Sequence, residues 1–597
     1  MLKLLLAVIL CFSIAFMSFN NSTEKNESMS SKASEKKWWK EAVVYQIYPR
    51  SFQDSDGDGV GDLKGLTSKL DYVKSLGIDI VWLNPIYGSP NADNGYDISN
   101  YDDIMKEFGT MSDFDLMLAG MHKRGIKLVM DLVVNHCSDE HEWFKQARSS
   151  RSNPYRNYFH WWPAENGKPP FRPGAFEVDG SGWRFDSLTN IYYLHYFSYM
   201  QPDLNWENPK LRQEIYAMMN RWFKKGVDGF RMDVIPFIAK DTTFLVITQK
   251  ELDAKYEGRW DVYLASGPGL HGYLQEMNKE VLSKYDVMAL AEGAGTTKGT
   301  AMNFVDPDRH ELDMSYHFDG VNLGYINGKY KTMNPDWSLT EFKKIYSDWD
   351  SVFAKKGWGT IYLANHDQPR MVSRWGNDAP EFRDASSKML TTFLLSMRGT
   401  PYYYYGDELG MTNVRLNKLE DFRDIEIMAE FGKLEKNGGD VKAFIEEQMQ
   451  YGGGRDNGRS PMQWSNAANA GFTTAIPWLK VNDNKNEINV EAAEKNPAST
   501  LNYFRKMAKL RKDHKDVLVY GKYTLLDSEN PDMYACTREA DGKKVLVLLS
   551  FKKNGGKFNL DKMELGDEWI NNMQPLKVNG TEVELQPYQA CIVKLKN

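Results

Sequence analysis

The sequence predicts an α/β protein: a (β/α)8 (TIM) barrel with an inserted subdomain after its third strand and a C-terminal antiparallel β domain. Three observations predict it. Short apolar, β-rich runs alternate with stretches of helical periodicity over most of the 597 residues. Polar residues follow the ends of these runs, and from about residue 517 the pattern changes to short alternating strands. A chain of this length exceeds one ordinary core, so two or three domains are expected.

Seven strands of the barrel can be placed from their apolar runs. They are expected at residues 43–48, 80–83, 127–134, 229–233, 287–291, 360–364 and 401–405. Helices are expected between them, for example at residues 211–225 and 270–284, where apolar residues recur at helical spacing and lysines occupy the last turns. Such alternation indicates a parallel sheet, and an eighth strand, for which no run stands out, would close it.

The same patterns divide the chain into segments. Residues 38–137 and 205–516 are expected to form the two parts of the barrel, and residues 138–204, rich in Trp, Pro, Gly and Tyr, an inserted subdomain. Residues 517–597 are expected to form a β-sandwich, with a strand at 544–551 and Asn-Gly turns at Asn554-Gly555 and Asn579-Gly580.

The N-terminus has the pattern of an export signal. Lys3 precedes an apolar run over residues 4–17, and a polar segment rich in Ser, Glu and Lys follows. We expect a signal peptide over residues 1–22 and a disordered tether over residues 23–37. The mature protein is then periplasmic or extracellular, without stable membrane insertion; retention of the segment as an N-terminal anchor is the alternative.

The amino-acid composition limits which classes of binding partner are expected. With 74 basic and 81 acidic residues the chain has a net charge of -7, so nucleic acid is not an expected partner. Aromatic residues make up 13%, which suits stacking on sugar rings but also the filling of a large core. Among the cysteines, buried free thiols are favoured over a Cys536–Cys591 bond.

Polar residues gather at the predicted carboxyl ends of the strands, where such a barrel keeps its active site. The third strand ends in residues 131–136 (DLVVNH), the fourth in Arg231 and Asp233, the fifth in Glu292, and the seventh in His366 and Asp367. Arg231 and Asp233 share one face of their strand, where the arginine can keep the carboxylate ionised as a nucleophile. A buried structural ion pair is the alternative. Glycosidic bond cleavage needs one attacking carboxylate and one carboxylic acid that protonates the leaving oxygen.

Four of these segments resemble, in order, the signature regions of the α-amylase superfamily of retaining glycoside hydrolases. They are residues 131–136 (DLVVNH), 229–233 (GFRMD), 291–292 (AE) and 365–367 (NHD). Residues 42–52, 94–98, 201–206 and 406–413 are similar to the oligo-1,6-glucosidase and α-glucosidase branch. The resemblance covers nearly everything after about Trp38.

The resemblance implies roles for individual residues. Asp233 is implied as the nucleophile, Glu292 as the general acid/base and Asp367 as the carboxylate that clamps sugar hydroxyls. It also implies substrate-binding residues around the non-reducing terminal glucose: Asp97, Tyr96, His136, Phe197, Gln201, Arg231, Val234, His366 and Arg455. We expect Arg231 to lower the pKa of Asp233.

Residue 234 bears on the linkage that is cleaved. Val234 matches the residue that in this branch goes with α-1,6 linkages, where α-1,4-specific relatives carry Ala or Thr. The resemblance thus implies a retaining, exo-acting α-glucosidase that cleaves the non-reducing terminal bond of short α-gluco-oligosaccharides, as in isomalto-oligosaccharides. Residues 291–295 read AEGAG where GEMPG is usual, so an α-1,4-acting or broad α-glucosidase stays an alternative.

A second signal is the acidic loop at residues 54–62 (DSDGDGVGD). Carboxylates on alternate residues, with glycines between them, let a backbone curl around a hard cation. An EF-hand is excluded, because Gly65 stands where its twelfth-position Glu belongs. The family implies a structural Ca2+ site here, with ligands Asp54, Asp56, Asp58, Asp62 and the carbonyl of Val60; a solvated acidic turn is the alternative.

Two rival functions remain. Sucrose isomerases share the scaffold but carry an Arg-x-Asp-Arg-Asp-type motif shortly after a Phe-Asp pair; here Phe318-Asp319 is followed by residues 320–326 (GVNLGYI), which lack every charge of that motif. A transporter heavy-chain-like ectodomain needs no catalytic carboxylates, yet all three are present. We expect a monomeric enzyme without an organic cofactor.

Overall fold

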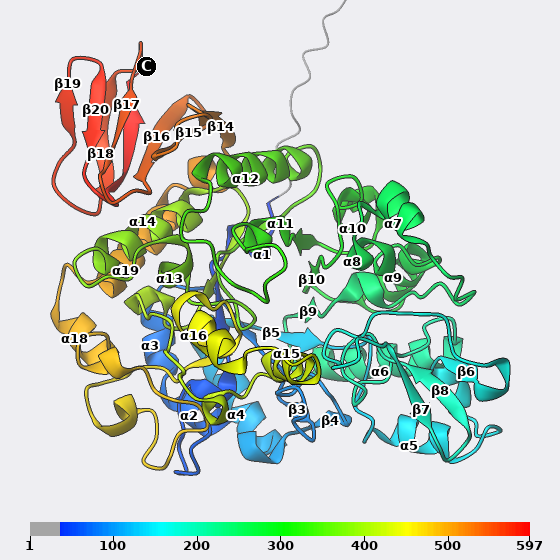
Figure 1. The fold of residues 1–597 in the computed structure, drawn as a ribbon. Helices are drawn as coiled ribbons and strands as arrows, with labels where there is room; N and C mark the ends of the chain where they lie inside the picture. The colour runs from blue at the N-terminus through cyan, green and yellow to red at the C-terminus, as the bar shows by residue number, and fades with distance from the viewer. Residues whose placement is uncertain (1–35, 597) are drawn as a thin grey trace, which may run out of the picture. The chain divides into compact units, whose positions relative to one another are not determined.

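Eight parallel strands form the barrel in this computed structural model, which describes residues 36–596 (Figure 1). They are β1 (Val44–Ile47), β2 (Ile80–Leu83), β5 (Lys127–Leu132), β9 (Gly229–Met232), β10 (Met288–Glu292), β11 (Met314–Tyr316), β12 (Thr360–Ile361) and β13 (Thr400–Tyr404). Hydrogen bonds join them in the order β11-β10-β9-β5-β2-β1-β13-β12. An isolated parallel bridge between Ser315 and Gly359 brings the two ends together, so the sheet is nearly closed and the predicted barrel is confirmed.

Seven of these strands lie where their apolar runs predict them, and β11 is the one that the sequence did not reveal. It has only three residues, Met314–Tyr316, and a serine at its centre. All three are buried because neighbouring strands and helices surround them. A run this short cannot be told from a loop by periodicity.

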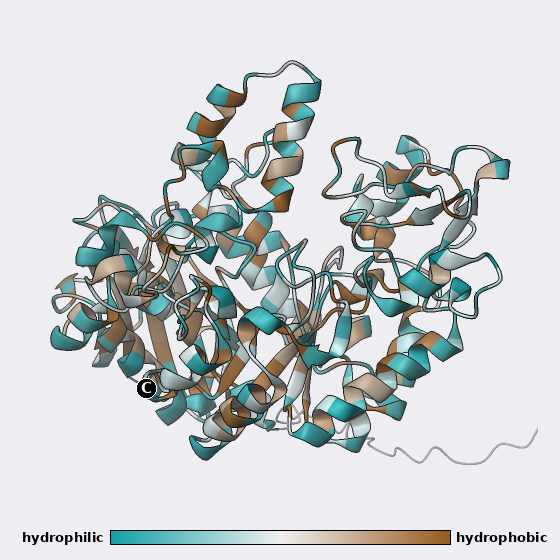
Figure 2. Cartoon of the chain, turned by 90° about the horizontal axis from the view of Figure 1, so that it is seen from below, coloured by the Kyte–Doolittle hydropathy of each residue, from teal (hydrophilic) through white to brown (hydrophobic). Residues whose placement is uncertain are grey.

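Helices cover the outside of the sheet, and Figure 2 shows apolar residues concentrated on the strands and hydrophilic ones on the outer helices. The longest is α6 (Pro209–Lys225), which begins with a proline after the Asn208 cap and ends at Gly226 in the left-handed region. The stretch predicted as one helix at 270–284 forms α9 (Leu270–Glu280) and a 3-10 turn, Leu282–Lys284. Other covering helices are α2 (Leu63–Ser68), α3 (Leu70–Ser75), α4 (Met111–Lys123), α12 (Leu339–Phe353), α14 (Arg383–Ser396) and α19 (Thr500–Asp513).

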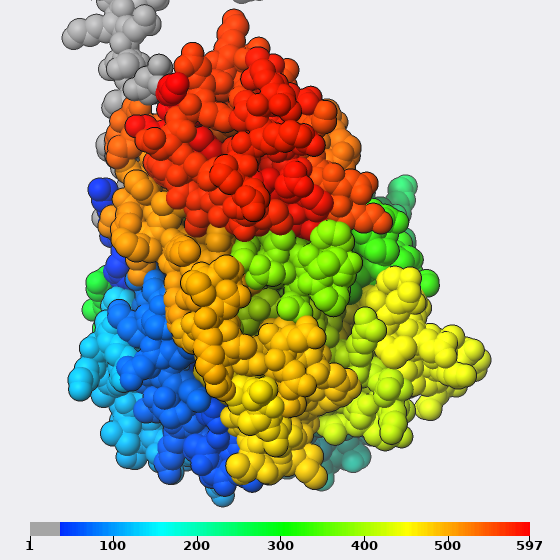
Figure 3. Space-filling model, turned by 90° about the vertical axis from the view of Figure 1, so that its left-hand side faces the viewer, coloured from blue at the N-terminus to red at the C-terminus, as the bar shows by residue number. Residues whose placement is uncertain are grey.

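Two segments extend from the barrel after the carboxyl ends of β5 and β13. Between β5 and α6 the chain forms α5 (Glu142–Ser149) and an antiparallel sheet of β6 (Trp161–Pro163), β7 (Trp183–Asp186) and β8 (Ile191–Leu194), in the order β6-β8-β7. After β13 it forms the helical pair α15 (Ile425–Lys436) and α16 (Val441–Tyr451), which projects at one side in Figure 3 (yellow). No pattern in the sequence predicts this pair.

The C-terminal part consists of two antiparallel sheets with a common core. One contains β14 (Lys522–Leu526), β15 (Met533–Ala540), β16 (Lys543–Ser550), β21 (Ala590–Leu595) and β18 (Leu565–Asn571), and the other β17 (Gly556–Asn559), β20 (Glu582–Leu585) and β19 (Lys577–Asn579). Asn579-Gly580 turns the β19–β20 hairpin, whereas Asn554-Gly555 connects strands of different sheets. Cys536 and Cys591 are buried free thiols, so the disulfide alternative is excluded.

The predicted signal peptide at residues 1–22 and all but the end of the predicted tether lie outside the described residues. Within residues 36–596, none of the helices combines the length and the apolar character that crossing a membrane requires.

Candidate active site

Arg231 on β9 lies at the centre of the site and contacts three carboxylates. Its Nη1 donates to Asp131 Oδ1 at 2.7 Å and to Asp233 Oδ1 at 2.6 Å, and its Nη2 forms an ion pair with Glu292 Oε1. These acids come from the carboxyl ends of the adjacent strands β5, β9 and β10. The parallel sheet therefore brings together groups that are up to 161 positions apart in the printed sequence.

Burial sets the protonation of this cluster. It raises the pKa of Asp233 well above its usual value; Arg231 opposes that shift, and the charges of Glu292 and Asp131 add to it. Arg231 therefore lowers the pKa of Asp233 as expected, but burial and the neighbouring acids raise it by more. Burial also raises the pKa of Asp131 to about 6, despite its contact with Arg231. Because several carboxylates share one guanidinium, the site can hold a carboxylic acid beside a carboxylate, as acid-assisted bond cleavage requires. Within the cluster, Arg231 is the group that favours the ionised form of Asp233, against burial and the neighbouring acids.

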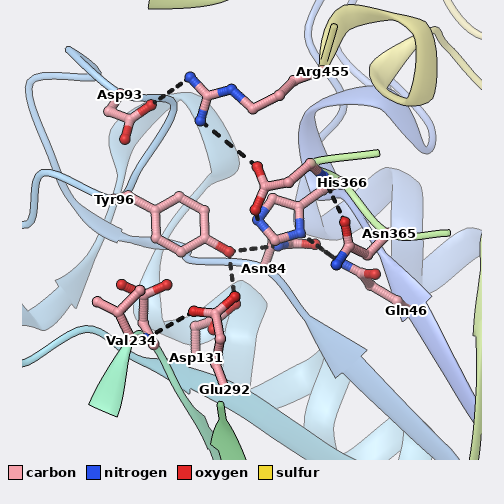
Figure 4. A network of polar contacts seen from close by, with 12 residues as sticks. Gln46, Asn84, Asp93, Tyr96, Asp131, Val234, Glu292, Asn365, His366 and Arg455 are labelled. Atoms are coloured by element: carbon pink, nitrogen blue, oxygen red, sulfur yellow. Dashed lines mark hydrogen bonds and ion pairs between the residues drawn. The ribbon is translucent and has the colours of Figure 1, made fainter. Parts of the chain in front are cut away.

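Glu292 is held at both of its oxygens. The hydroxyl of Tyr316 on β11 donates to Oε1 at 2.7 Å. The backbone N–H of Val234 donates to Oε2 at 2.8 Å (Figure 4). Val234 makes this contact from the left-handed region, with φ 33° and ψ 38°. A β-branched residue adopts that conformation only at a cost, so its surroundings must enforce it.

Asp367 is paired with a histidine and an arginine. His366 accepts a hydrogen bond at Nδ1 from Gln46 Nε2 (2.9 Å), so its proton is assigned to Nε2, which lies 3.2 Å from Asp367 Oδ2. Arg459 Nη2 donates to Asp367 Oδ1 at 2.9 Å. Burial alone would raise the pKa of Asp367, but His366, Arg459 and Arg455 together hold it below its usual range. Asp367 is therefore an ionised acceptor for hydroxyl groups.

Arg455 joins two loops at the edge of the site. Its Nη2 lies 3.2 Å from Asp93 Oδ1 and 2.6 Å from Asp424 Oδ1, and the first of these contacts is drawn in Figure 4. Gln201 Nε2 donates to the other oxygen of Asp93 at 3.2 Å. Asp93, Gln201 and Arg455 thus form a polar wall that meets Asp367, because Arg455 Nη1 is 3.6 Å from Asp367 Oδ1.

The predicted aromatic and histidine residues lie beside this wall. The ring of Tyr96 stacks on His366 with centroids 5.2 Å apart and planes 5° from parallel, and its hydroxyl donates to Asp131 Oδ2 at 3.1 Å. The ring of His136 lies 5.1 Å from that of Phe197. Burial lowers the pKa of His136 to about 3, so this histidine is neutral.

Asp97 is the predicted binding residue that the structure does not bring into the site. Its oxygens accept hydrogen bonds from Ser89 Oγ and from the backbone N–H groups of Ala92 and Asp93, which fastens its own loop. The carboxylate that faces Arg455 is Asp93, four positions earlier. Arg459 and Tyr316 also belong to the site and were not predicted from the sequence, because Arg459 lies outside the four signature segments and Tyr316 lies on β11.

Three of the five predicted metal ligands gather in the acidic loop. Carboxylate oxygens of Asp54, Asp56 and Asp58 all lie within 4.8 Å of one another. Asp62 is engaged elsewhere: its Oδ1 accepts from Gly65 N at 2.8 Å, which caps α2, and its Oδ2 accepts from Ser55 N at 2.6 Å. The loop thus gathers three carboxylates, a donor set that suits a hard cation, and both oxygens of Asp54 also accept hydrogen bonds, from Gly57 N, Gly59 N and Thr473 Oγ1.

Comparison with known protein families identifies the same type of catalytic domain that the carboxylate cluster indicates. The family described as "Alpha amylase, catalytic domain" matches residues 46–521. The chain belongs to the α-amylase family of glycoside hydrolases.

Relatives within the α-amylase family match over nearly their whole length. The chain is 48% identical to the oligo-1,6-glucosidase of Parageobacillus thermoglucosidasius over 94% of this chain and 100% of that one, and 46% identical to the oligo-1,6-glucosidase of Bacillus cereus with the same coverage. A solved structure, the isomaltulose synthase SmuA from Protaminobacter rubrum, matches with a TM-score of 0.90 at 42% identity, over 94% of this chain and 100% of that one.

Proposed function

We propose that this glycoside hydrolase is a retaining, exo-acting α-glucosidase that removes the non-reducing terminal glucose of short isomalto-oligosaccharides by cleaving α-1,6 bonds. One observation carries the proposal: a single guanidinium, that of Arg231, contacts both Asp233 and Glu292. Carboxyl groups that share one small cation lie close together, and retaining enzymes need a separation of roughly 5 to 5.5 Å.

Each carboxyl group has a role in this reaction. An oxygen of Asp233 attacks the anomeric carbon while Glu292 gives its proton to the leaving oxygen, and the glycosidic bond breaks. Water then attacks the glucosyl ester, Glu292 takes the proton from water, and the bond to Asp233 breaks. Asp367, ionised beside Arg459, accepts hydrogen bonds from the ring hydroxyls.

The polar wall of Asp93, Gln201 and Arg455 supports exo action. Ion pairs across it join the loop that carries Asp93 to the segment after α16. A wall on this side of Asp367 would oppose a sugar chain that continues past the terminal glucose. We therefore propose that Asp93 takes the binding role that the sequence had suggested for Asp97.

Two observations support the proposed specificity for α-1,6 linkages. The most similar relatives named above are oligo-1,6-glucosidases. In addition, the buried side chain of Val234 follows the nucleophile and belongs to the same apolar cluster as Ala294, in the loop after Glu292. A second candidate, sucrose isomerisation, is favoured by the likeness to solved structures of two enzymes of that kind, the isomaltulose synthase SmuA and the trehalulose synthase MutB. Residues 320–326 lack the charged motif of those enzymes.

The remaining expectations complete the proposal. The cluster of Asp54, Asp56 and Asp58 supports a structural Ca2+ that holds the loop after the first strand. We further propose that the enzyme is exported, periplasmic or extracellular, and acts as a monomer. Elemental analysis, cell fractionation and light scattering test these three points.

The function is tested with isomaltose, panose, maltose, sucrose, trehalose and short dextran oligomers, each scored for released glucose. We expect isomaltose and the dextran oligomers to be preferred, with α-glucose as the first product by NMR. β-Glucose would exclude retention, and conversion of sucrose to an isomeric disaccharide would favour the isomerase.

Two variants test the assigned roles. Asp233→Ala and Glu292→Gln are each expected to lower turnover of isomaltose by roughly four orders of magnitude with an unchanged fold, because both groups act on one bond. Circular dichroism serves as the folding control. Near-normal turnover of isomaltose by either variant would refute its assigned role.

A further inference from the structure

Tyr316 stands between the two halves of the catalytic site. Its hydroxyl accepts hydrogen bonds from Arg231 Nη2 at 2.9 Å and Nε at 3.2 Å, and donates to Glu292 Oε1 at 2.7 Å. Burial raises the pKa of Tyr316 well above its usual value, so the hydroxyl keeps its proton. With Arg231 supplying two donors to its oxygen, that one proton is directed at Glu292.

This arrangement suits one protonation state of Glu292. Tyr316 O–H supplies a donor to Oε1, and Val234 N–H supplies one to Oε2. Donors at both oxygens favour an ionised carboxylate, since a carboxylic acid would place its own proton against one of them. Glu292 is ionised after it has protonated the leaving sugar, and it must be ionised to take the proton from the attacking water.

The number of carboxylates that share the positive charge of Arg231 falls during the reaction, and this change also favours the ionised form of Glu292. In the free site its guanidinium is shared among Asp131, Asp233 and Glu292. When Asp233 becomes a neutral glucosyl ester, one of these negative charges disappears. Arg231 can then support Glu292 more strongly, both directly and through the Tyr316 hydroxyl.

We propose that Tyr316 is a positioning residue for the second half of the reaction: its hydroxyl couples Arg231 to Glu292 and holds Glu292 ionised and oriented for the attack of water on the glucosyl ester. In that step the water oxygen bonds to the anomeric carbon, the ester bond returns its electron pair to Asp233, and Glu292 receives the proton. This inference rests on the proposed retaining mechanism.

The test is Tyr316→Phe with an aryl α-glucoside that carries a good leaving group, such as p-nitrophenyl α-glucoside. A phenolate leaves with little help from an acid, so the rate then depends on hydrolysis of the glucosyl ester. We expect kcat to fall about 10-fold or more, as for loss of a hydrogen bond to a charged group. KM should fall with it, and a burst of nitrophenolate should equal the enzyme concentration.

A matched control is Tyr362→Phe. Tyr362 lies beside Tyr316, with ring centroids 5.0 Å apart, but its hydroxyl donates to the backbone oxygen of His317 at 2.8 Å. This variant should show no burst and an unchanged KM. If Tyr316→Phe behaves like the control, or lowers kcat without lowering KM, the inference is overturned.

Two further experiments cover the cases in which Tyr316→Phe does not fold or the proposed function itself is wrong. If Tyr316→Phe does not fold, site-specific 3-fluorotyrosine at position 316 makes the hydroxyl a stronger donor and should change the rate of ester hydrolysis; an unchanged rate would overturn the inference. Wild-type enzyme that releases no glucose from any α-glucoside would instead defeat the proposed function itself.

Discussion

Val234 shows how much one residue of this site must satisfy. Its amide donates to Glu292 at 2.8 Å, its backbone is in the left-handed region at φ 33°, and the residue is only 8% exposed. Since a β-branched residue is unfavourable in that conformation, the packing around it has to over-determine the geometry. The side chain is therefore held rigidly beside the Asp233 and Glu292 carboxyl groups.

This rigidity leads to a prediction about linkage. Val234→Ala or Val234→Thr is expected to raise activity on maltose relative to isomaltose, because an α-1,6 link has one more rotatable bond and lets the leaving sugar clear the valine. Removing such a contact shifts discrimination by about 1 to 3 kcal/mol, so the ratio should change by roughly one order of magnitude or more. Steady-state kinetics on both disaccharides measure it. A ratio that stays constant in both variants would show that residue 234 does not set the linkage.

Other residues show what the sequence could reveal about the site. Arg231, Asp233 and Glu292 were predictable, because strand ends in a parallel barrel converge and a period of two puts Arg231 and Asp233 on one face. Asp93 and Asp97 were not separable, since both lie in one turn. Only the hydrogen bonds of the folded loop decide which carboxylate fastens the backbone and which faces Arg455.

At the scale of elements, α2 and the acidic loop share a residue. Asp62 accepts a hydrogen bond from Gly65 N and so caps α2, while carboxylate oxygens of Asp54, Asp56 and Asp58 lie within 4.8 Å of one another. A cap stabilises its helix with or without a cation. The carboxylate cluster, by contrast, repels itself when no cation is bound.

These two contributions can be separated by calorimetry. We expect a chelator to lower the Tm of the wild type more than it lowers activity at mild temperature, because the loop does not contact the reacting bond. Asp56→Asn should abolish most of the effect of the chelator, whereas Asp62→Ala should lose about 1 kcal/mol of stability even with chelator present. An identical Tm with and without chelator, and no metal by elemental analysis, would rule out the site.

Strand β11 shows why one element escaped prediction. The other seven strands carry apolar runs, but β11 consists of Met314, Ser315 and Tyr316 and is defined by its neighbours: Leu290 to Glu292 of β10 pair with it in parallel register. Closure of the barrel therefore depends on tertiary contacts that no local pattern reports. The same strand delivers the Tyr316 hydroxyl to Glu292.

At the scale of the whole molecule, the barrel and the C-terminal sheets share one hydrophobic cluster. Phe393 of α14 packs against Phe342 of α12 and Tyr534 of β15, with ring centroids 5.2 and 5.3 Å apart. Buried arginines join the same parts. Arg538 of β15 donates to Ser396 O, at the end of α14, at 2.6 Å, and Arg511 of α19 donates both to Leu395 O of α14 at 2.9 Å and to Leu518 O of the C-terminal part at 3.1 Å. The barrel and the C-terminal sheets, which the sequence pattern separates into two segments, are therefore coupled through a common core.

This coupling predicts the effect of removing Arg538. The side chain is fully buried and also donates to Gly521 O at 2.9 Å, so Arg538→Ala leaves buried carbonyls without donors. We expect a loss of about 3 kcal/mol, and for a chain of this size a fall in Tm of roughly 2 to 3 °C. Loss of activity and unfolding of the C-terminal sheets should still occur in one transition, because the two parts have a common core.

Arg221→Ala is the matched control, since Arg221 is half-exposed and pairs with Asp102 at the surface. Its stability should change by about 0 to 1 kcal/mol. Differential scanning calorimetry, run beside residual activity after heating, compares the variants. Two separate transitions, with activity surviving the first, would show that the C-terminal sheets unfold independently of the barrel and that the buried arginines do not couple them.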